Sequence, residues 1–302
     1  MCLTEEQESY NGENSAEIKR VIIDSDTYNE IDDQFAIVQA MLSPDKIKVE
    51  AILAAPFSNH RSTSPGNGME LSYDEIICLL DRLNISSKKL VWRGVTEYVG
   101  ENKIAREAEA VERLIELARS ASPVHPIYII AIAAISNIAS ALLKAPDIAD
   151  SIVIVWLASN ALHWPDVWEF NLSQDIGAAQ VVLDSRVRLV LVPCMGIVTH
   201  LRSTVPEIER YVEPHGKIGH FLACRFKEYN KEHIGWSKEI WDMAATSWLL
   251  HPEAMKSISI SAPIINNDGS WTMTSDRHSI KYVWWLDRDI ILRDFFIRLA
   301  SR

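Results

Sequence analysis

The 302-residue chain alternates between short, continuous apolar runs and segments in which apolar residues recur with the period of a helix. A continuous apolar run is typical of a buried strand, and a 3.6-residue period is typical of a helix packed on a sheet. Strands are predicted at 21–23, 47–57, 90–92, 126–134, 151–158 and 187–192. Helices are predicted at 35–42, 72–83, 106–120, from residue 136 onward, 174–184, 239–250 and 289–301.

Apolar strands that alternate with helices predict a parallel sheet covered on both sides. We therefore expect an α/β fold, a single-domain, open, mostly parallel (Rossmann-like) sheet with helices on both faces. The domain would span residues 19–302, after a disordered or frayed tail at 1–18. Ligands bind such sheets beyond the carboxyl ends of the strands, so polar residues at those ends are candidates for chemistry.

The second half of the chain has a less regular pattern. Residues 205–230 are expected to be helical in parts, with a break at Pro214-His215-Gly216. Strand-like patterns follow at 258–265, 271–274 and 280–285, and two loops are expected at 61–69 and 159–171. Ser136 is a candidate N-cap for the helix that it opens.

Composition narrows the classes of partner. The chain is 48% hydrophobic and 24% charged, which is ordinary for a globular protein. Its formal net charge of −11 argues against nucleic acid and against an anionic membrane, because both favour basic surfaces.

Cysteine usage and the N-terminal residues indicate a compartment. The four cysteines, Cys2, Cys78, Cys194 and Cys224, show no zinc-binding spacing and predict free thiols in a reducing environment. The first 16 residues are polar and acidic, without the pattern of a secretory signal, and no apolar run reaches membrane-spanning length. A cytoplasmic location is expected.

Tryptophan is unevenly distributed. Nine of the ten tryptophans lie between Trp156 and Trp285. Most would pack in the core, but their concentration in the second half also predicts an aromatic-lined pocket there.

The densest candidate chemistry lies at 21–42, where an apolar strand runs into Asp24 and Asp26 and an apolar helix opens with Asp32 and Asp33. The two-residue period of a strand places Asp24 and Asp26 on one side of its end. A helix N-terminus supplies only about half a positive charge, which cannot balance four carboxylates. The sequence therefore predicts a divalent cation, and the oxygen donors favour Ca²⁺ or Mg²⁺ over zinc.

Several common enzyme signatures are missing from the sequence. It contains no GxGxxG, P-loop, GxSxG or HExxH, so dinucleotide oxidoreductases, P-loop kinases, serine hydrolases and zinc proteases lose their usual support. The strand followed by Asp-Ser-Asp-Thr at 24–27 fits the opening of haloacid-dehalogenase-type phosphatases, with Asp24 as nucleophile and Asp26 as general acid. The strand at 152–156 is not followed by the acidic pair which that chemistry needs.

A series of motifs resembles the inosine-uridine-preferring nucleoside hydrolase family, in family order. The strand, Asp-x-Asp, turn, Asp-Asp and helix of 21–42 are similar to the family's N-terminal signature, and Asn59 follows the second strand where the family has Gly-Asn. Ser-Asn-Ile-Ala at 136–139 resembles its Thr-Asn-Ile-Ala, and Glu-Phe-Asn at 169–171 resembles its Glu-Phe-Asn. Trp-Asp-Met-Ala at 241–244 resembles its His-Asp-x-x. The resemblance covers the chain from about residue 19 to its end.

The resemblance implies a Ca²⁺-dependent N-ribohydrolase. Asp26, Asp33 and Asp242 would bind one Ca²⁺ together with the main-chain carbonyl of Ile132. Asp26 is also the candidate general base, taking a proton from a Ca²⁺-bound water. Nearby carboxylates would stabilise the oxocarbenium-like sugar, and the products would be a free base and ribose.

The resemblance also implies a sugar-binding set. Asp32 would hold ribose hydroxyls, and Asn59, Glu169 and Asn171 would complete the pocket. Neighbouring helix residues point about 100° apart, so Asp32 and Asp33 can serve the sugar and the metal respectively. Asp24 would orient the loop.

Four positions depart from the family pattern. The turn between Asp26 and Asp32 is longer than the family's Pro-Gly-x, Ser58 replaces a Gly, and Leu-Ala-Ser stands at 157–159 in place of Met-Gly-Gly. The fourth is Trp241, where many members have a His that could protonate a leaving purine.

Without that His, the base must be activated in another way. Stacking between Trp241 and Trp164, or protonation by His163, are the candidates. The expected partner is a small-molecule nucleoside, and the expected assembly is a homodimer or homotetramer. The alternative function is a non-catalytic member that binds metal and ribosides without turnover.

Overall fold

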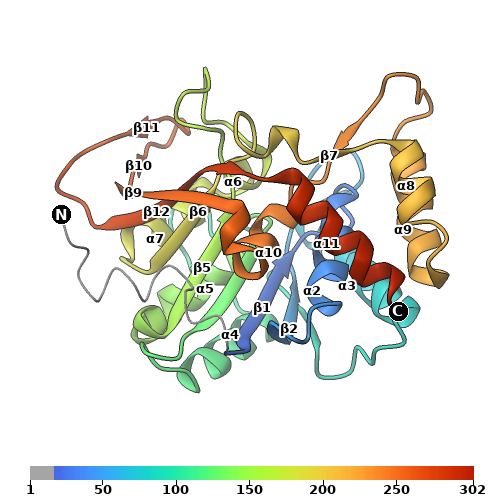
Figure 1. The fold of residues 1–302 in the computed structure, drawn as a ribbon. Helices are drawn as coiled ribbons and strands as arrows, with labels where there is room; N and C mark the ends of the chain where they lie inside the picture. The colour runs from blue at the N-terminus through green and yellow to red at the C-terminus, as the bar shows by residue number, and fades with distance from the viewer. Residues whose placement is uncertain (1–16) are drawn as a thin grey trace.

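The computed structural model describes residues 17–302, and its centre is an eight-stranded sheet (Figure 1). The strand order is β3-β2-β1-β4-β5-β6-β12-β9. The strands are β1 (Lys19–Ser25), β2 (Ile47–Ala54), β3 (Val91–Arg93), β4 (Ile127–Ile132), β5 (Ile152–Leu157), β6 (Arg188–Val192), β9 (Met255–Ser261) and β12 (Ser279–Leu286). All neighbouring pairs are parallel except β12 and β9. The predicted single-domain, mostly parallel sheet is confirmed, whereas the tail predicted at 1–18 lies almost wholly outside the described residues.

Helices cover both faces of the sheet (Figure 1). They are α2 (Asp32–Met41), α3 (Pro65–Arg82), α4 (Glu109–Arg119), α5 (Ser136–Lys144), α6 (Phe170–Gln174), α7 (Ile176–Asp184), α8 (Val205–Tyr211), α9 (Gly216–Tyr229), α10 (Met243–Leu250) and α11 (Arg288–Ala300). Successive residues of β1 enter different cores: Ile23 belongs to the core that includes α2, α3, α9, α10 and α11, and Ile22 belongs to the core that includes α4, α5 and α7. This two-residue period explains why the strands are apolar on both faces.

The strand order creates a crevice at one edge of the sheet. From β1 the chain builds outward to β2 and β3, and from β4 it builds in the opposite direction to β5 and β6. The loops that follow β1 and β4 therefore leave the sheet on opposite sides. In open α/β sheets, ligands bind at this switch point, beyond the carboxyl ends of the strands.

The starts of α3 and α5 differ from the prediction. The segment predicted as a loop at 61–69 already contains the start of α3, where the Ser64 side chain accepts a hydrogen bond from the Asn67 N–H (3.1 Å) and Pro65 occupies the first turn. Ser136 is the first residue of α5 and not its N-cap. Its hydroxyl instead donates to the Asp175 carboxylate (2.7 Å), which ties α5 to α7.

The C-terminal third also has shorter elements than predicted. The helix expected at 239–250 begins at Met243, because Lys238–Glu239 forms a short strand, β8, with β7 (Arg202–Ser203). The predicted break near residues 214–216 is confirmed, since α8 ends at Tyr211 and α9 starts at Gly216. The two short strands β10 (Ile264–Ile265) and β11 (Trp271–Thr272) form a separate hairpin.

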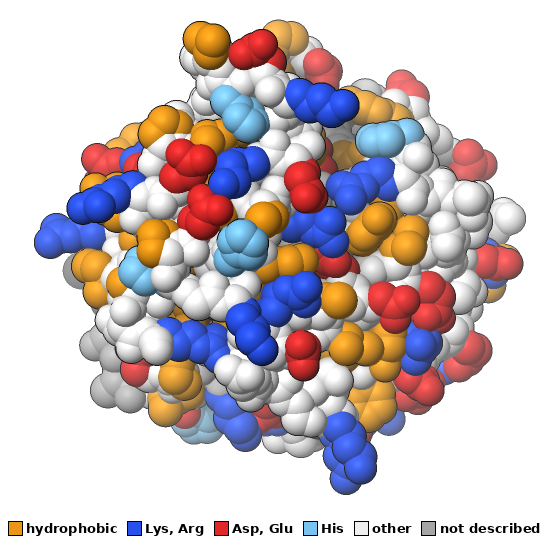
Figure 2. Space-filling model, turned by 90° about the vertical axis from the view of Figure 1, so that its right-hand side faces the viewer, with side chains coloured by type: hydrophobic (Ala, Val, Ile, Leu, Met, Phe, Trp, Pro, Cys, Tyr) orange, Lys and Arg blue, Asp and Glu red, His pale blue; other side chains and the backbone are white. Residues whose placement is uncertain are grey.

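The surface is mixed in charge where Figure 2 shows it. Lys and Arg side chains lie among Asp and Glu on that face, which is not the one-signed basic surface that favours nucleic acid. Within residues 17–302, no helix has both the length and the apolar character needed to cross a membrane. The predicted free thiols are confirmed for Cys78, Cys194 and Cys224, and Cys2 is outside the described part of the chain.

Candidate active site

A cavity of about 870 Å³ opens at the carboxyl edge of the sheet, at the switch point between β1 and β4. It is lined by most of the residues that the sequence singled out. These are Asp26, Asp32, Asp33, Asn59, Ile132, Glu169, Asn171, Trp241 and Asp242. Residues that are more than 200 positions apart in the chain thus meet in one concave site.

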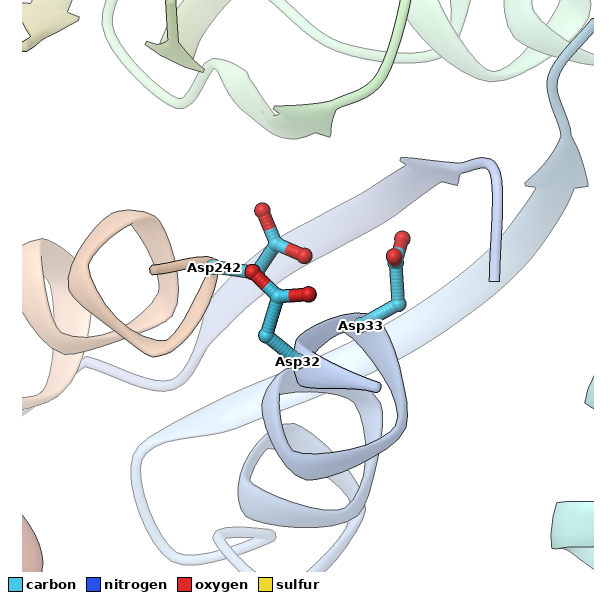
Figure 3. Close-up of side chains that lie close together, drawn as sticks. All are labelled: Asp32, Asp33 and Asp242. Carbon is cyan, nitrogen blue, oxygen red and sulfur yellow. The ribbon is translucent and has the colours of Figure 1, made fainter. Parts of the chain in front are cut away.

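Three buried carboxylates form the centre of the site. Asp32 and Asp33 occupy the first turn of α2, and Asp242 directly precedes α10. Their oxygens lie within 4.8 Å of one another. Figure 3 shows these side chains at the starts of two helices, Asp32 and Asp33 on α2 and Asp242 at α10. Both helix N-termini direct positive potential at this cluster.

Asp26 lies at the edge of the same cluster. Its side chain is buried, and its Oδ2 atom has no hydrogen-bond partner among the described residues. Burial raises the pKa of Asp26 well above its usual range, and the charges of Asp33 and Asp32 raise it further. Burial also raises the pKa of Asp32, to about 6. The site therefore concentrates carboxylates whose charged form is disfavoured by burial and by mutual repulsion.

These features fit a hard divalent cation. The donors are carboxylate oxygens, one of them is buried without a partner among the described residues, and three residues each place one oxygen within 4.8 Å of the others. The three-carboxylate cluster contains Asp32, whereas the resemblance places Asp26 on the metal and Asp32 on the sugar. Both side chains line the cavity, so either could contribute.

Hydroxyl and amide groups orient the neighbouring acids. Ser25, the last residue of β1, donates from its hydroxyl to Asp33 Oδ1 (2.6 Å). Asn137 Nδ2 donates to Asp24 Oδ1 (2.8 Å), and Asp24 is buried outside the cavity lining. Asp24 therefore does not line the cavity, and the phosphatase interpretation, which needs its carboxylate there, finds no support.

Glu169 and Asn171 are fixed by the backbone around them. Glu169 caps α6 and accepts hydrogen bonds from the N–H groups of Asn171 (2.9 Å), Leu172 (3.1 Å) and Ser159 (3.0 Å). Burial raises its pKa to about 7 despite these bonds. Asn171 Nδ2 donates to the carbonyl oxygen of Leu157 (3.0 Å). Both side chains are thus held at the carboxyl end of β5, against the cavity.

Ser159 occupies a backbone conformation that favours glycine. Its φ angle is +65°, in the left-handed region that L-residues rarely adopt. Its hydroxyl donates to the Val167 carbonyl (3.0 Å), which helps to hold the strained turn. This conformation gives a physical reason for the Gly of the family motif at 157–159, where this chain has Leu-Ala-Ser.

Asn59 has a structural as well as a cavity-lining position. Its Oδ1 accepts from the Arg61 N–H (2.8 Å), and its Nδ2 donates to Asn29 Oδ1 (2.6 Å). It thus closes its own loop and joins it to the loop after Asp26. Ser58, in the position of the family's Gly, is exposed, and its N–H donates to the side chain of Gln174 (2.8 Å).

The aromatic side chains at the cavity differ in part from those expected. Trp241 lines it, but Trp164 and His163 do not and are exposed to solvent. Both lie against Gly196, which adopts a positive φ of 88°. Trp168 lines the cavity instead and packs against Gly269. Periodicity does not determine which tryptophan of an irregular loop turns inward.

Several lining residues were not identified from the sequence. Arg225 and Tyr229 come from α9, Cys194 follows β6, and His60 and Arg61 follow β2. Arg225 is held by two hydrogen bonds to the buried carboxylate of Glu75 (2.9 and 3.0 Å). The sequence around Arg225 and Tyr229 does not indicate a role in a site, because an arginine or a tyrosine on an amphipathic helix is usually a surface residue. His60 and Arg61 follow a strand end, which was the available clue.

The fold and the site together define a class: an α/β enzyme with a carboxylate-rich cavity at the switch point of a parallel sheet. Residues 80–289 match the family model described as inosine-uridine preferring nucleoside hydrolase. The chain belongs to that family, and it is an enzyme of the nucleoside hydrolase type. The match begins after the acidic loop, so the placement of Asp26, Asp32 and Asp33 rests on the structure.

Solved structures give the same fold. A purine-preferring ribonucleoside hydrolase from Gardnerella vaginalis is 20% identical, with a TM-score of 0.77 over 94% of this chain and 98% of that one. A plant nucleoside hydrolase is 19% identical, with a TM-score of 0.74 over 95% and 100%. An inosine-uridine preferring nucleoside hydrolase from Bacillus anthracis is 16% identical, with a TM-score of 0.70 over 94% and 99%. No curated protein matches the sequence.

Proposed function

We propose that this protein hydrolyses the N-glycosidic bond of ribonucleosides to a free base and ribose, with Ca²⁺ as its cofactor. The observation that carries the proposal is the group of buried carboxylates of Asp26, Asp32, Asp33 and Asp242 in one cavity. Family membership supplies the reaction class, and the oxygen-only donor set favours Ca²⁺ or Mg²⁺ over zinc.

The metal ligands would be Asp26, Asp33, Asp242 and the main-chain carbonyl of Ile132, the last residue of β4. When bound, the cation would supply positive charge that lowers the pKa of a nearby water and fixes the ribose diol. Asp32 belongs to the cluster and also lines the cavity, which suits a contact with ribose hydroxyls.

Asp26 is proposed as the general base. Its Oδ2 atom is buried and has no partner among the described residues, so it is free to accept a proton from an attacking water. The remaining carboxylates would stabilise the positive charge that develops on the sugar ring. Glu169 and Asn171, held by hydrogen bonds at the end of β5, would orient the ribose together with Asn59, which also lines the cavity.

The leaving base would stack on an aromatic side chain. Trp241 and Trp168 both line the cavity, and stacking on an aromatic ring supports a departing heterocycle. Trp164 and His163 remain candidates only if their loop turns toward the cavity when substrate binds. In the described structure His60 is the histidine that lines it.

The function is tested by assaying purified protein with purine and pyrimidine nucleosides and with p-nitrophenyl phosphate, before and after chelation. Release of base and ribose that is lost with EDTA and restored by Ca²⁺ supports the proposal. Tight riboside binding without release would favour the non-catalytic alternative. Phosphate release would contradict both.

A further inference from the structure

Lys238 is a nearly buried cation beside the acidic cluster. Its side chain is 7% exposed, and its Nζ atom forms an ion pair with Glu30 Oε2 at 2.7 Å. A lysine is seldom buried to this extent unless its charge is compensated. Neither residue had an assigned role from the sequence.

The environment of Lys238 keeps it charged. Burial lowers the pKa of its ammonium group, but the carboxylates of Asp32 and Glu30 outweigh burial and raise it above its usual value. A permanent positive charge therefore acts on one member of the central carboxylate cluster.

Lys238 also joins three parts of the site. Glu30 belongs to the turn between Asp26 and Asp32, and its Oε1 accepts a hydrogen bond from the Tyr229 hydroxyl of α9 (3.2 Å). Lys238 lies in β8, three residues before Trp241. Its Nζ is 5.0 Å from the centre of the Tyr229 ring and 5.9 Å from that of Trp241, within the range of cation–π contacts.

The turn that carries Glu30 is the longer turn noted above, in place of the family's Pro-Gly-x. A longer turn has more conformations, and its entropy must be overcome for Asp26 and Asp32 to keep fixed positions. The ion pair with Lys238 fixes this turn against β8, and the hydrogen bond to Tyr229 fixes it against α9. The added length and the buried lysine are thus parts of one arrangement.

We propose that Lys238 is a positioning residue for the hydrolase site: through Glu30 it fixes the turn between Asp26 and Asp32 against β8 and α9, and its charge weakens the attraction of the carboxylate cluster for a divalent cation. The inference rests on the proposed function. It assigns two separable effects to the Lys238 side chain: one on the position of the turn between Asp26 and Asp32, and one on the electrostatic attraction of the carboxylate cluster for a cation.

Three variants separate these effects. Lys238→Met removes a positive charge, Glu30→Gln removes a negative one, and the double variant leaves the net charge of the pair unchanged. Lys48→Met is the matched control, because Lys48 pairs with Glu50 at 2.8 Å but its side chain is 69% exposed. Each protein is studied by nucleoside kinetics, by calorimetric titration with Ca²⁺ and by thermal unfolding.

The geometric effect predicts that all three variants lose kcat/KM, by about ten- to a hundredfold, because misplacement of catalytic groups has costs of this order. The charge effect predicts that Lys238→Met binds Ca²⁺ more tightly than wild type, that Glu30→Gln binds it more weakly and that the double variant resembles wild type. Lys48→Met should match wild type in both measurements.

The outcomes distinguish this inference from the proposed function. Equal Ca²⁺ affinity in wild type and both single variants, with unchanged kcat/KM, would overturn the inference alone. A wild-type protein that binds Ca²⁺ but releases no base contradicts the proposed function alone, and the calorimetric order of the variants then decides the inference. If the variants are simply less well folded, their unfolding temperature should fall and Ca²⁺ affinity should be reduced in both Lys238→Met and Glu30→Gln. That result would also contradict the inference about Lys238.

Discussion

Replacement of Asp242 by Asn tests whether a divalent cation compensates the repulsion between the carboxylates of the acidic cluster. The oxygens of Asp32, Asp33 and Asp242 lie within 4.8 Å of one another. At that separation two unit charges repel by about 3–4 kcal/mol at an effective dielectric constant near 20. Burial, followed by the charges of Asp32 and Asp33, raises the pKa of Asp242 well above its usual range, so the charged form of this residue is disfavoured in the metal-free site. The net gain from removing the charge should be about 1–2 kcal/mol.

In buffer with EDTA, Asp242→Asn should therefore unfold at a temperature a few degrees above wild type, since about 1 kcal/mol shifts the midpoint of a chain of this size by roughly 2–4 °C. The Asn amide can also donate to the remaining carboxylates. With Ca²⁺ at about 100 times its Kd, wild type should gain about 2.7 kcal/mol and the variant much less. Scanning calorimetry in the two buffers measures both effects.

Asp268→Asn serves as the control, because this exposed aspartate lies outside the cavity lining and should respond in neither buffer. The reasoning is refuted if Asp242→Asn is less stable than wild type in EDTA and wild type is insensitive to both Ca²⁺ and Mg²⁺. That result would mean that the cluster is satisfied by protons and hydrogen bonds alone.

Two further predictions concern stability. Asp175→Ala should lower the free energy of unfolding, measured by chemical denaturation, by about 3–5 kcal/mol. The reason is that the buried Asp175 carboxylate accepts hydrogen bonds from the N–H groups of Val99, Gly100 and Ala178 and from the Ser136 hydroxyl. An unchanged denaturation midpoint would contradict this prediction. Burial raises the pKa of Asp294, but hydrogen bonds from His251 and Arg298 outweigh it and lower the pKa to about 2. The charged Asp294 carboxylate therefore stabilises the folded protein above the pKa of an unfolded aspartate, and this stabilisation is lost as pH falls towards 2. At pH 7, Asp294→Asn should be less stable than wild type by at most about 1 kcal/mol, because the side chain is partly exposed. Near pH 2 the two proteins should be equally stable.

The fold was predictable because its signal is local. Ile22 and Ile23 belong to a strand that is apolar on both faces, and such strands alternating with helices leave few architectures open. The early start of α3 was also present in the sequence, as Ser64 followed by Pro65, but the glycine and serine content around it suggested a loop. Ser136 was misassigned because its hydroxyl serves a tertiary contact with Asp175.

The site was predictable only where its residues follow strands or motifs. Asp26 and Asp33 belong to such a pattern, whereas Lys238 and Tyr229 reach the site through the packing of α9 and β8. Neither carries a local signal, because a lysine or a tyrosine in a polar segment is usually solvated. Trp164 is the opposite case: it was predicted to line the cavity but does not, because the sequence of an irregular loop does not show which side chain points inward.

The most direct test of the account is the hydrolysis of nucleosides by wild type and by Asp26→Asn in the presence of Ca²⁺. Release of free base and ribose should be measured alongside riboside binding, with Asp268→Asn as the control. The account predicts that wild type releases both products and that Asp26→Asn still binds the riboside but loses about 10²–10⁴-fold in kcat. Hydrolysis by Asp26→Asn at the wild-type rate would contradict it.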